Sequence, residues 1–293
     1  MVSPHSRARV RSLGLIIRDR RTAADRTLTW LAHHLGMSRS ALNRFELGRG
    51  WPNTVDLVEG ITRILAALGV QGEDLDEIMQ LAQDAGHPNW LAVGREGSKQ
   101  FATFLEYEAI ATGITSVDTS VFPGLIQTRD YAEAVFQSGD MPLDVQQEHL
   151  VTRLGRQNIL DTAQLTVVLD ESVLTRQVGT GATMRSQLDW MVALAGQDNI
   201  DVRVIPNNRA SLTVDGSYVL LEFSDQPPVA YADSALGGIF LDQEDRVAHL
   251  VLRTTRLVSA ALSPADSVEL VKHALLALDD EDGRVRVCSD RMA

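Results

Sequence analysis

The segment between residues 38 and 47 carries side chains that could read DNA. At about 100° per residue, Ala41, Leu42 and Phe45 share one narrow sector of a helix, which predicts the side that faces a core. The opposite side is polar and carries Arg39, Ser40, Asn43 and Arg44. Such side chains hydrogen-bond to base edges and phosphates, so this face is typical of a helix that enters the major groove. Any surface helix also has a polar face, and the neighbouring elements decide between the two interpretations.

The residues around this segment predict a helix-turn-helix. Thr27 offers a hydroxyl that can cap a helix over 28–35, residues 36–37 make a tight turn, and Ser38 caps the polar helix. Helical spacing of apolar residues predicts three more helices, over 12–24, 55–68 and 75–85. We therefore expect residues 1–85 to form an all-α domain of five helices that binds DNA.

Positive charge is concentrated at the start of an acidic chain. The 293 residues carry a formal net charge of −12, yet residues 1–50 hold ten arginines and only three acidic residues. Because phosphates attract local positive charge, the acidic total does not argue against DNA as a partner; the alternative is a solvated, charged terminus. We predict DNA contacts from Thr27, Thr29, Ser38, Arg39, Ser40, Asn43, Arg44 and Arg49.

Composition and motifs argue against several other classes of protein. The single cysteine, Cys288, excludes an intrachain disulfide and a cysteine-based zinc site. No apolar run approaches the ~18–20 residues that span a bilayer, and the apolar segment 13–17 is too short for a signal peptide, so we expect a cytoplasmic protein. Without a glycine-rich phosphate loop, a Gly-x-Ser-x-Gly motif or histidines at metal-ligating spacing, we expect no cofactor, metal or catalytic site.

The pattern changes after residue 85, from helices alone to a mixture of helices and strands. Glycine, proline and polar residues predict a linker over 86–98. Strands are predicted over 165–169, 202–205, 218–223 and 229–231, and helices over 101–109, 131–136, 143–160, 184–194, 246–262 and 264–278. Because the strands follow no steady βαβ rhythm, we expect an α+β domain over 99–280 that mediates dimerisation or control, followed by a tail over 281–293.

One loop of this second domain has two interpretations. Residues 121–128 read as a loop or short strand before a helix, and Leu125, Ile126 and Tyr131 could simply pack in the core. Alternatively, the loop lines a pocket or a partner groove. The residues predicted for such a site are Gln127, Thr128, Tyr131, Arg156 and Glu171. Of Glu171 and the adjacent Asp170, one is expected to cap the next helix and the other to pair with an arginine such as Arg156, rather than to catalyse a reaction.

The N-terminal part resembles the XRE/Cro-type regulators, which have a lambda-repressor-like fold. The matching residues are Arg18, Thr27, Leu31, Ala32, Gly36, Ser38, Ser40, Arg44, Glu46, Gly48 and Pro52. The resemblance implies that Arg18 and Glu46 form an internal ion pair that braces the helices.

The remainder resembles the C-terminal domain of actinobacterial XRE-family regulators, a domain without an agreed activity. The matching residues include Trp90, Glu108, 123–128, Tyr131, Arg153, Arg156, 169–171 and 261–264. The resemblance implies a small partner protein, as in toxin–antitoxin or developmental switch modules. We therefore predict a homodimeric repressor or autoregulator that binds a double-stranded operator and responds to a partner protein or small ligand. The alternative is an antitoxin-like protein that sequesters a neighbouring gene product and binds DNA only for autoregulation.

Overall fold

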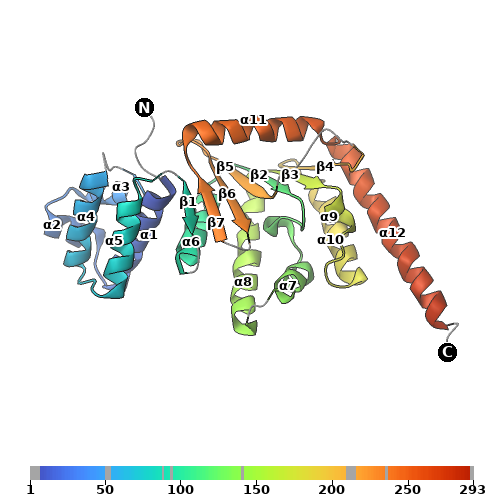
Figure 1. Cartoon of the computed structure of the whole chain (residues 1–293), viewed down its shortest axis with the longest axis horizontal. Coiled ribbons are helices and arrows are strands. Elements are labelled where there is room, and N and C mark those ends of the chain that lie inside the picture. Colours follow the sequence, from blue (N-terminus) through green and yellow to red (C-terminus); the bar gives the residue numbers. More distant parts are fainter. Residues whose placement is uncertain are drawn as a thin grey trace. The chain divides into compact units, whose positions relative to one another are not determined.

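The computed structural model of the chain describes residues 7–49, 54–87, 89–92, 95–139, 142–208, 216–234 and 237–290. The chain forms two compact units, and each is described by itself (Figure 1). The first unit contains residues 1–108 and 227–249, and the second contains residues 109–226 and 250–293. No helix of the described ranges is long and apolar enough to cross a membrane.

Five helices form the all-α part of the first unit, as the sequence predicts. They are α1 (Arg7–Ala23), α2 (Leu28–Leu35), α3 (Arg39–Glu46), α4 (Thr54–Ala67) and α5 (Glu73–Asp84). Their apolar faces bury a common core that includes Leu13, Ile17, Leu31, Leu42, Phe45, Leu57, Ile61, Ile64 and Ile78. Burial of these side chains is what makes such short helices stable, because an isolated helix of eight residues is marginal in water.

The first unit also contains three antiparallel strands and one helix. Strand β1 (Trp90–Ala92) pairs with β7 (Gly237–Leu241), β7 pairs with β6 (Val229–Ser234), and α6 (Arg95–Ala109) belongs to the same unit. Aromatic side chains fill the space between these elements: the ring centroids of Phe104 and Tyr231 are 4.6 Å apart, and those of Tyr231 and Phe240 are 4.9 Å apart. Five residues of this region are buried aromatics, namely Trp90, Phe104, Tyr107, Tyr231 and Phe240.

This grouping differs from the boundaries that we predict from the sequence. The expected linker over 86–98 contains strand β1 and the start of α6, and residues 227–249 belong to the first unit although they follow much later in the chain. The physical reason is pairing at long range: Trp90 lies opposite Phe240 in the β1–β7 register. A three-residue strand among glycines and a proline gives no local signal of that partner.

The second unit is built on strands β5 (Tyr218–Glu222), β2 (Gly113–Asp118), β3 (Gln164–Asp170) and β4 (Ile200–Ile205), in that order. β2, β3 and β4 run parallel to one another, whereas β5 is antiparallel to β2. Parallel strands need both faces covered, which explains why their residues are mainly buried and apolar.

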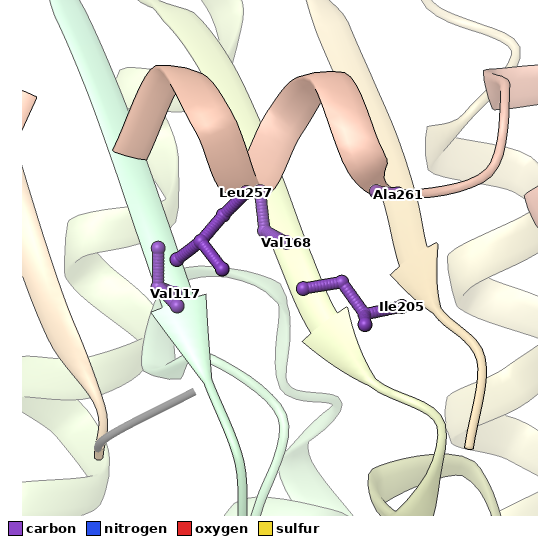
Figure 2. Close-up of a cluster of buried hydrophobic side chains, with 5 residues drawn as sticks. All are labelled: Val117, Val168, Ile205, Leu257 and Ala261. Atoms are coloured by element: carbon purple, nitrogen blue, oxygen red, sulfur yellow. The ribbon is translucent and has the colours of Figure 1, made fainter. Parts of the chain in front are cut away.

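Helices cover both faces of these parallel strands (Figure 1). The part of α11 (Glu244–Ala260) that belongs to the second unit lies on one side, and α7 (Arg129–Gln137), α8 (Leu143–Arg156) and α10 (Gly181–Leu194) lie on the other. Figure 2 shows the contact between α11 and the parallel strands, in which one apolar residue from each strand packs against the end of α11. The cluster consists of Val117, Val168, Ile205, Leu257 and Ala261. Three short elements, η1 (Gly124–Ile126), η2 (Gln157–Asp161) and α9 (Ser172–Thr175), and the long helix α12 (Pro264–Asp290) complete the unit.

The predicted fold classes are confirmed: the helices over 7–84 form an all-α helix-turn-helix region, and the part after it is α+β. Three strands, β1, β2 and β7, were not predicted. The segment predicted as a loop or short strand over 121–128 instead contains the 3-10 turn η1. β2 lies between β5 and β3, yet it carries Thr115 and Ser116 between Ile114 and Val117, which weakens the apolar signal of a buried strand.

Candidate nucleic-acid interface

The turn between α2 and α3 has the local geometry that its sequence favours. The Thr27 hydroxyl accepts a hydrogen bond from the backbone N–H of Trp30 at 3.1 Å, which caps α2. The Ser38 hydroxyl accepts from the N–H of Ala41, also at 3.1 Å, and caps α3. Between them Gly36 ends α2 with a φ of 65°, a left-handed conformation that glycine adopts without strain. The two caps and the glycine fix how α3 is presented.

Helix α3 buries one face and exposes the other. Leu42, Phe45 and Glu46 are buried against the other helices of the region. The exposed face carries all four side chains predicted to read DNA, namely Arg39, Ser40, Asn43 and Arg44. The structure therefore presents their guanidinium, hydroxyl and amide groups to solvent. That they contact bases stays a prediction.

The other predicted DNA-contacting residues, Thr27, Thr29, Ser38 and Arg49, are exposed as well. Beside them lies an aromatic stack that the sequence reasoning missed. The Arg26 guanidinium lies 4.4 Å from the centroid of the Trp30 ring, and this ring stacks on His34 at 5.0 Å. The i, i+4 spacing of Trp30 and His34 in α2 is the signal that could have revealed it.

The predicted ion pair between Arg18 and Glu46 is wrong in its arginine. Glu46 is paired with Arg21, whose Nε and Nη2 donate to the two carboxylate oxygens at 2.6 and 2.9 Å. These hydrogen bonds raise the pKa of Arg21 above its usual value, against the opposing effect of burial. Arg18 instead donates to Glu106 of α6 at 2.9 Å. Arg18 and Arg21 lie one turn apart on α1, so helical spacing alone cannot tell which of them reaches Glu46.

The arginines of residues 1–50 fall into two groups. Five of them donate to carbonyl or carboxylate oxygens inside the first unit, namely Arg7, Arg9, Arg11, Arg18 and Arg21. The other five are exposed, namely Arg20, Arg26, Arg39, Arg44 and Arg49. Arg20 forms a surface ion pair with Asp74 at 2.8 Å. Only part of the positive charge counted in the sequence is therefore presented to a polyanion.

This division predicts a moderate salt dependence of DNA binding. Each phosphate that is neutralised contributes about −0.9 to the slope of log affinity against log salt. Five exposed arginines therefore give a slope of at most about −4.5 for each helix-turn-helix region, which we call the head. Ten arginines on phosphates would give about −9. The slope is measured by titrating a labelled duplex with the full chain at several salt concentrations. A slope near the larger value, or no salt dependence, would contradict this division of the arginines.

The loop predicted as a ligand or partner site is held together by buried glutamines. The Gln127 side chain is buried; its Nε2 donates to the carbonyl of Phe122 at 2.6 Å, and its Oε1 accepts from Arg153 at 2.7 Å. The Gln127 carbonyl accepts from Gln157 Nε2 at 2.6 Å. Gln127 therefore directs its polar atoms to the protein itself, which favours the packing interpretation of this loop.

The following residues are fixed in the same way. The backbone N–H of Thr128 donates to Gln187 Oε1 at 2.7 Å, and Gln187 Nε2 donates to the carbonyl of Ile126 at 2.8 Å. The Thr128 hydroxyl caps α7 by accepting from the N–H of Tyr131. Burial raises the pKa of Tyr131 to about 12. Gln187 was missed as a member of this group because it lies 59 residues away in the sequence.

Arg156 and Glu171 complete the predicted set. Arg156 lies beside Gly124, since a Cβ built there would be 3.6 Å from Arg156 Nη1. Glu171 is not brought to the loop by any of its hydrogen bonds: its Oε2 accepts from the N–H of Asn207 at 2.6 Å. Of the two acids, Asp170 accepts from the backbone N–H of Ser172 at the start of α9, and the contact of Glu171 is with backbone rather than with an arginine.

We expect Gln127→Ala to lower the free energy of unfolding by about 1–3 kcal/mol, because it leaves a buried carbonyl and an arginine without their hydrogen-bond partner. The measurement is denaturant unfolding of the full chain. Gln147→Ala, which changes an exposed glutamine of α8, is the matched control and should stay within about 0.5 kcal/mol. An unchanged stability of the Gln127 variant would return the loop to the ligand-site interpretation.

Two family models match the chain. A helix-turn-helix domain model matches residues 12–78, which contain α2, α3 and α4 with parts of α1 and α5. A model described as a domain of unknown function, DUF5753, matches residues 101–273. No curated protein matches the chain. The first match suggests a DNA-binding regulator. Because the second match spans more than half of the chain, the protein belongs to the DUF5753 family, with a helix-turn-helix domain before the family's own domain.

Proposed function

We propose that this protein is a sequence-specific DNA-binding transcriptional regulator of the XRE/Cro type that acts in the cytoplasm as a repressor or autoregulator. The observation that carries the proposal is helix α3. It is capped by Ser38, packed through Leu42 and Phe45, and polar on its exposed face. The residue motifs that resemble actinobacterial regulators support the same role.

The exposed groups match the chemistry of a duplex. Asn43 can donate to and accept from an adenine edge, and Arg44 or Arg39 can donate two hydrogen bonds to guanine. Thr27 and Thr29 lie at the start of α2, where hydroxyl and backbone N–H groups are suited to phosphate oxygens. Base reading by α3 and phosphate contact by α2 then fix one orientation on the DNA.

Formation of a homodimer would increase the specificity with which α3 recognises its operator sequence. Two heads held by the rest of the protein place their α3 helices in successive major grooves about 34 Å apart, so the operator would have two half-sites one helical turn apart. A partner protein or small ligand that alters the spacing of the heads then weakens binding without touching DNA. This is the proposed mode of control.

The test is selection of bound sequences from random duplexes, together with mapping of the DNA that the protein protects at the promoter of its own gene. We expect one palindromic site with half-sites about 10 base pairs apart. Equal affinity for all duplexes would overturn the proposal.

An antitoxin-like role is the second candidate, and one observation favours it. Leu143 and Val151 are 76% and 68% exposed on α8, and their spacing of eight residues places them on one face with the exposed Gln147 between them. In this alternative, that face of α8 is where the small partner would pack. Co-purification with the product of a short neighbouring reading frame, combined with DNA binding restricted to the chain's own promoter, would favour this role.

Neither role includes a catalytic step. Asp170 and Glu171, the adjacent acids at the end of β3, accept hydrogen bonds from Ser172 and Asn207 respectively, which suits loop-stabilising acids. Within the described ranges, no three histidine, cysteine or acidic residues are grouped to hold a metal ion.

A further inference from the structure

The N-terminus of α1 is held by a residue from the second segment of the first unit, residues 227–249. The backbone N–H of Ala8 donates to Asp242 Oδ2 at 2.9 Å, and Arg7 Nη2 donates to the Asp242 carbonyl at 2.7 Å. Asp242 is buried and follows directly after β7. A carboxylate that accepts from a free N–H at a helix N-terminus stabilises that helix, so Asp242 serves α1 as an N-terminal cap.

A second acid from outside the helix-turn-helix, Glu106 of α6, contacts Arg11, and Arg11 in turn contacts the C-terminal end of α3. The Arg11 side chain is buried; its Nη1 donates to the carbonyl of Leu47, the C-cap of α3, at 2.8 Å. Its Nη2 donates to Glu106 of α6 at 3.3 Å, and its guanidinium lies 5.7 Å from the centroid of the Tyr107 ring. Glu106 also accepts from Arg18 at 2.9 Å. Glu106 therefore holds α1 directly, and it holds the end of α3 through one arginine.

Helices α1 and α3 pack with their backbones in direct contact. A Cβ built at Gly14 of α1 would lie 2.6 Å from the Glu46 carbonyl oxygen and 2.7 Å from that of Phe45. A Cβ built at Gly48, just after α3, would lie 2.6 Å from the Arg11 Cα. No space separates the two backbones at these points, so a displacement of α1 has to displace α3 as well.

We propose that Asp242 and Glu106 are positioning residues for DNA recognition, through which residues of the DUF5753 match hold α3 in place. This inference rests on the proposed function. Both acids lie within the DUF5753 match over 101–273, whereas α2 and α3 lie within the helix-turn-helix match. Asp242 precedes α11 by two residues, and the chain of α11 continues into the second unit.

The experiment compares three variants of the full chain. Asp242→Ala removes the acceptor for the Ala8 N–H, and Glu106→Gln keeps the shape of the side chain but removes its charge. Asp74→Asn is the matched control, because it breaks the exposed ion pair with Arg20 in the same helical region. Amide hydrogen exchange of α3 and affinity for selected and unrelated duplexes are measured for each.

We expect hydrogen exchange over 42–48 to quicken about tenfold in the first two variants, because a cap or a charged partner is lost and local opening becomes easier. Affinity for the selected duplex should fall about tenfold, while affinity for unrelated duplexes stays the same because Arg39 and Arg44 remain exposed. The control should match the parent in hydrogen exchange over 42–48 and in its preference for the selected duplex over unrelated ones. If Asp242→Ala does not fold, Asp242→Asn keeps the cap with a neutral acceptor and replaces it.

Unchanged exchange over 42–48 in both variants would overturn the proposal, whatever the DNA result. Faster exchange with unchanged affinity for the selected duplex would also overturn it, because the acids would then stabilise α3 without positioning it for reading. A parent chain that prefers no sequence would refute the proposed function instead. In that case the exchange data alone would decide whether the acids hold α3.

Discussion

Asn43→Ala and Arg44→Ala should each weaken binding to the selected operator by about 1–3 kcal/mol, the value of one base contact. Both side chains lie exposed on α3, so neither substitution removes a packing contact and the helix content should not change. The two variants should differ on unrelated DNA. Arg44→Ala also loses a positive charge and should reduce the salt slope by about 1, whereas Asn43→Ala should leave non-specific binding as it is.

The measurement is a binding titration on operator and on unrelated duplexes, with circular dichroism to compare helix content. Arg129→Ala is a suitable control, because Arg129 is an exposed arginine of the second unit in an i, i+4 pair with Glu133. If both α3 variants bind the operator as tightly as the parent, α3 is not the reading helix.

Glu46→Ala should lower the free energy of unfolding by about 3 kcal/mol or more, the usual cost of removing one member of a buried ion pair. The Arg21 and Glu46 side chains are only 12% and 5% exposed, and two hydrogen bonds join them. Without the carboxylate, the Arg21 guanidinium would stay charged in a largely dry site. DNA binding should be lost together with stability, because Glu46 is the last residue of α3.

The comparison with Arg18→Ala makes this prediction specific to the pair seen in the structure. Arg18 is partly exposed and bound to a partly exposed Glu106, so its loss should cost about 1 kcal/mol or less. Denaturant unfolding at neutral pH ranks the variants. A larger loss for Arg18→Ala than for Glu46→Ala would instead support the pairing that the family resemblance implies.

The parts of this molecule that sequence reasoning predicted are those decided by near neighbours in the chain. Thr27 and Ser38 cap helices because their hydroxyls reach an N–H three residues on, and Gly36 turns the chain because it has no side chain. The sides of α3 follow from its apolar spacing. These features need no knowledge of the rest of the fold.

The parts that could not be predicted depend on partners far away in the sequence. The choice of Arg21 over Arg18 depends on where α3 meets α1 and on α6, which supplies Glu106 to Arg18. Strand β1 exists because β7 lies beside it, and Gln127 is buried because Arg153 and Gln157 lie around it. None of these partners leaves a periodic signal in the sequence.

The hydrogen bond between Ala8 and Asp242 also bears on synthesis of the protein. Its two residues are 234 positions apart, and translation adds roughly 5–20 residues per second. The first helix is therefore made at least ten seconds or so before the residue that caps it. Until then α1 lacks this restraint, and an unfinished chain carries its recognition helix without one of the contacts that hold α1. Loss of Asp242, as in a prematurely terminated message, would thus give a head that competes poorly with complete molecules for the same operator.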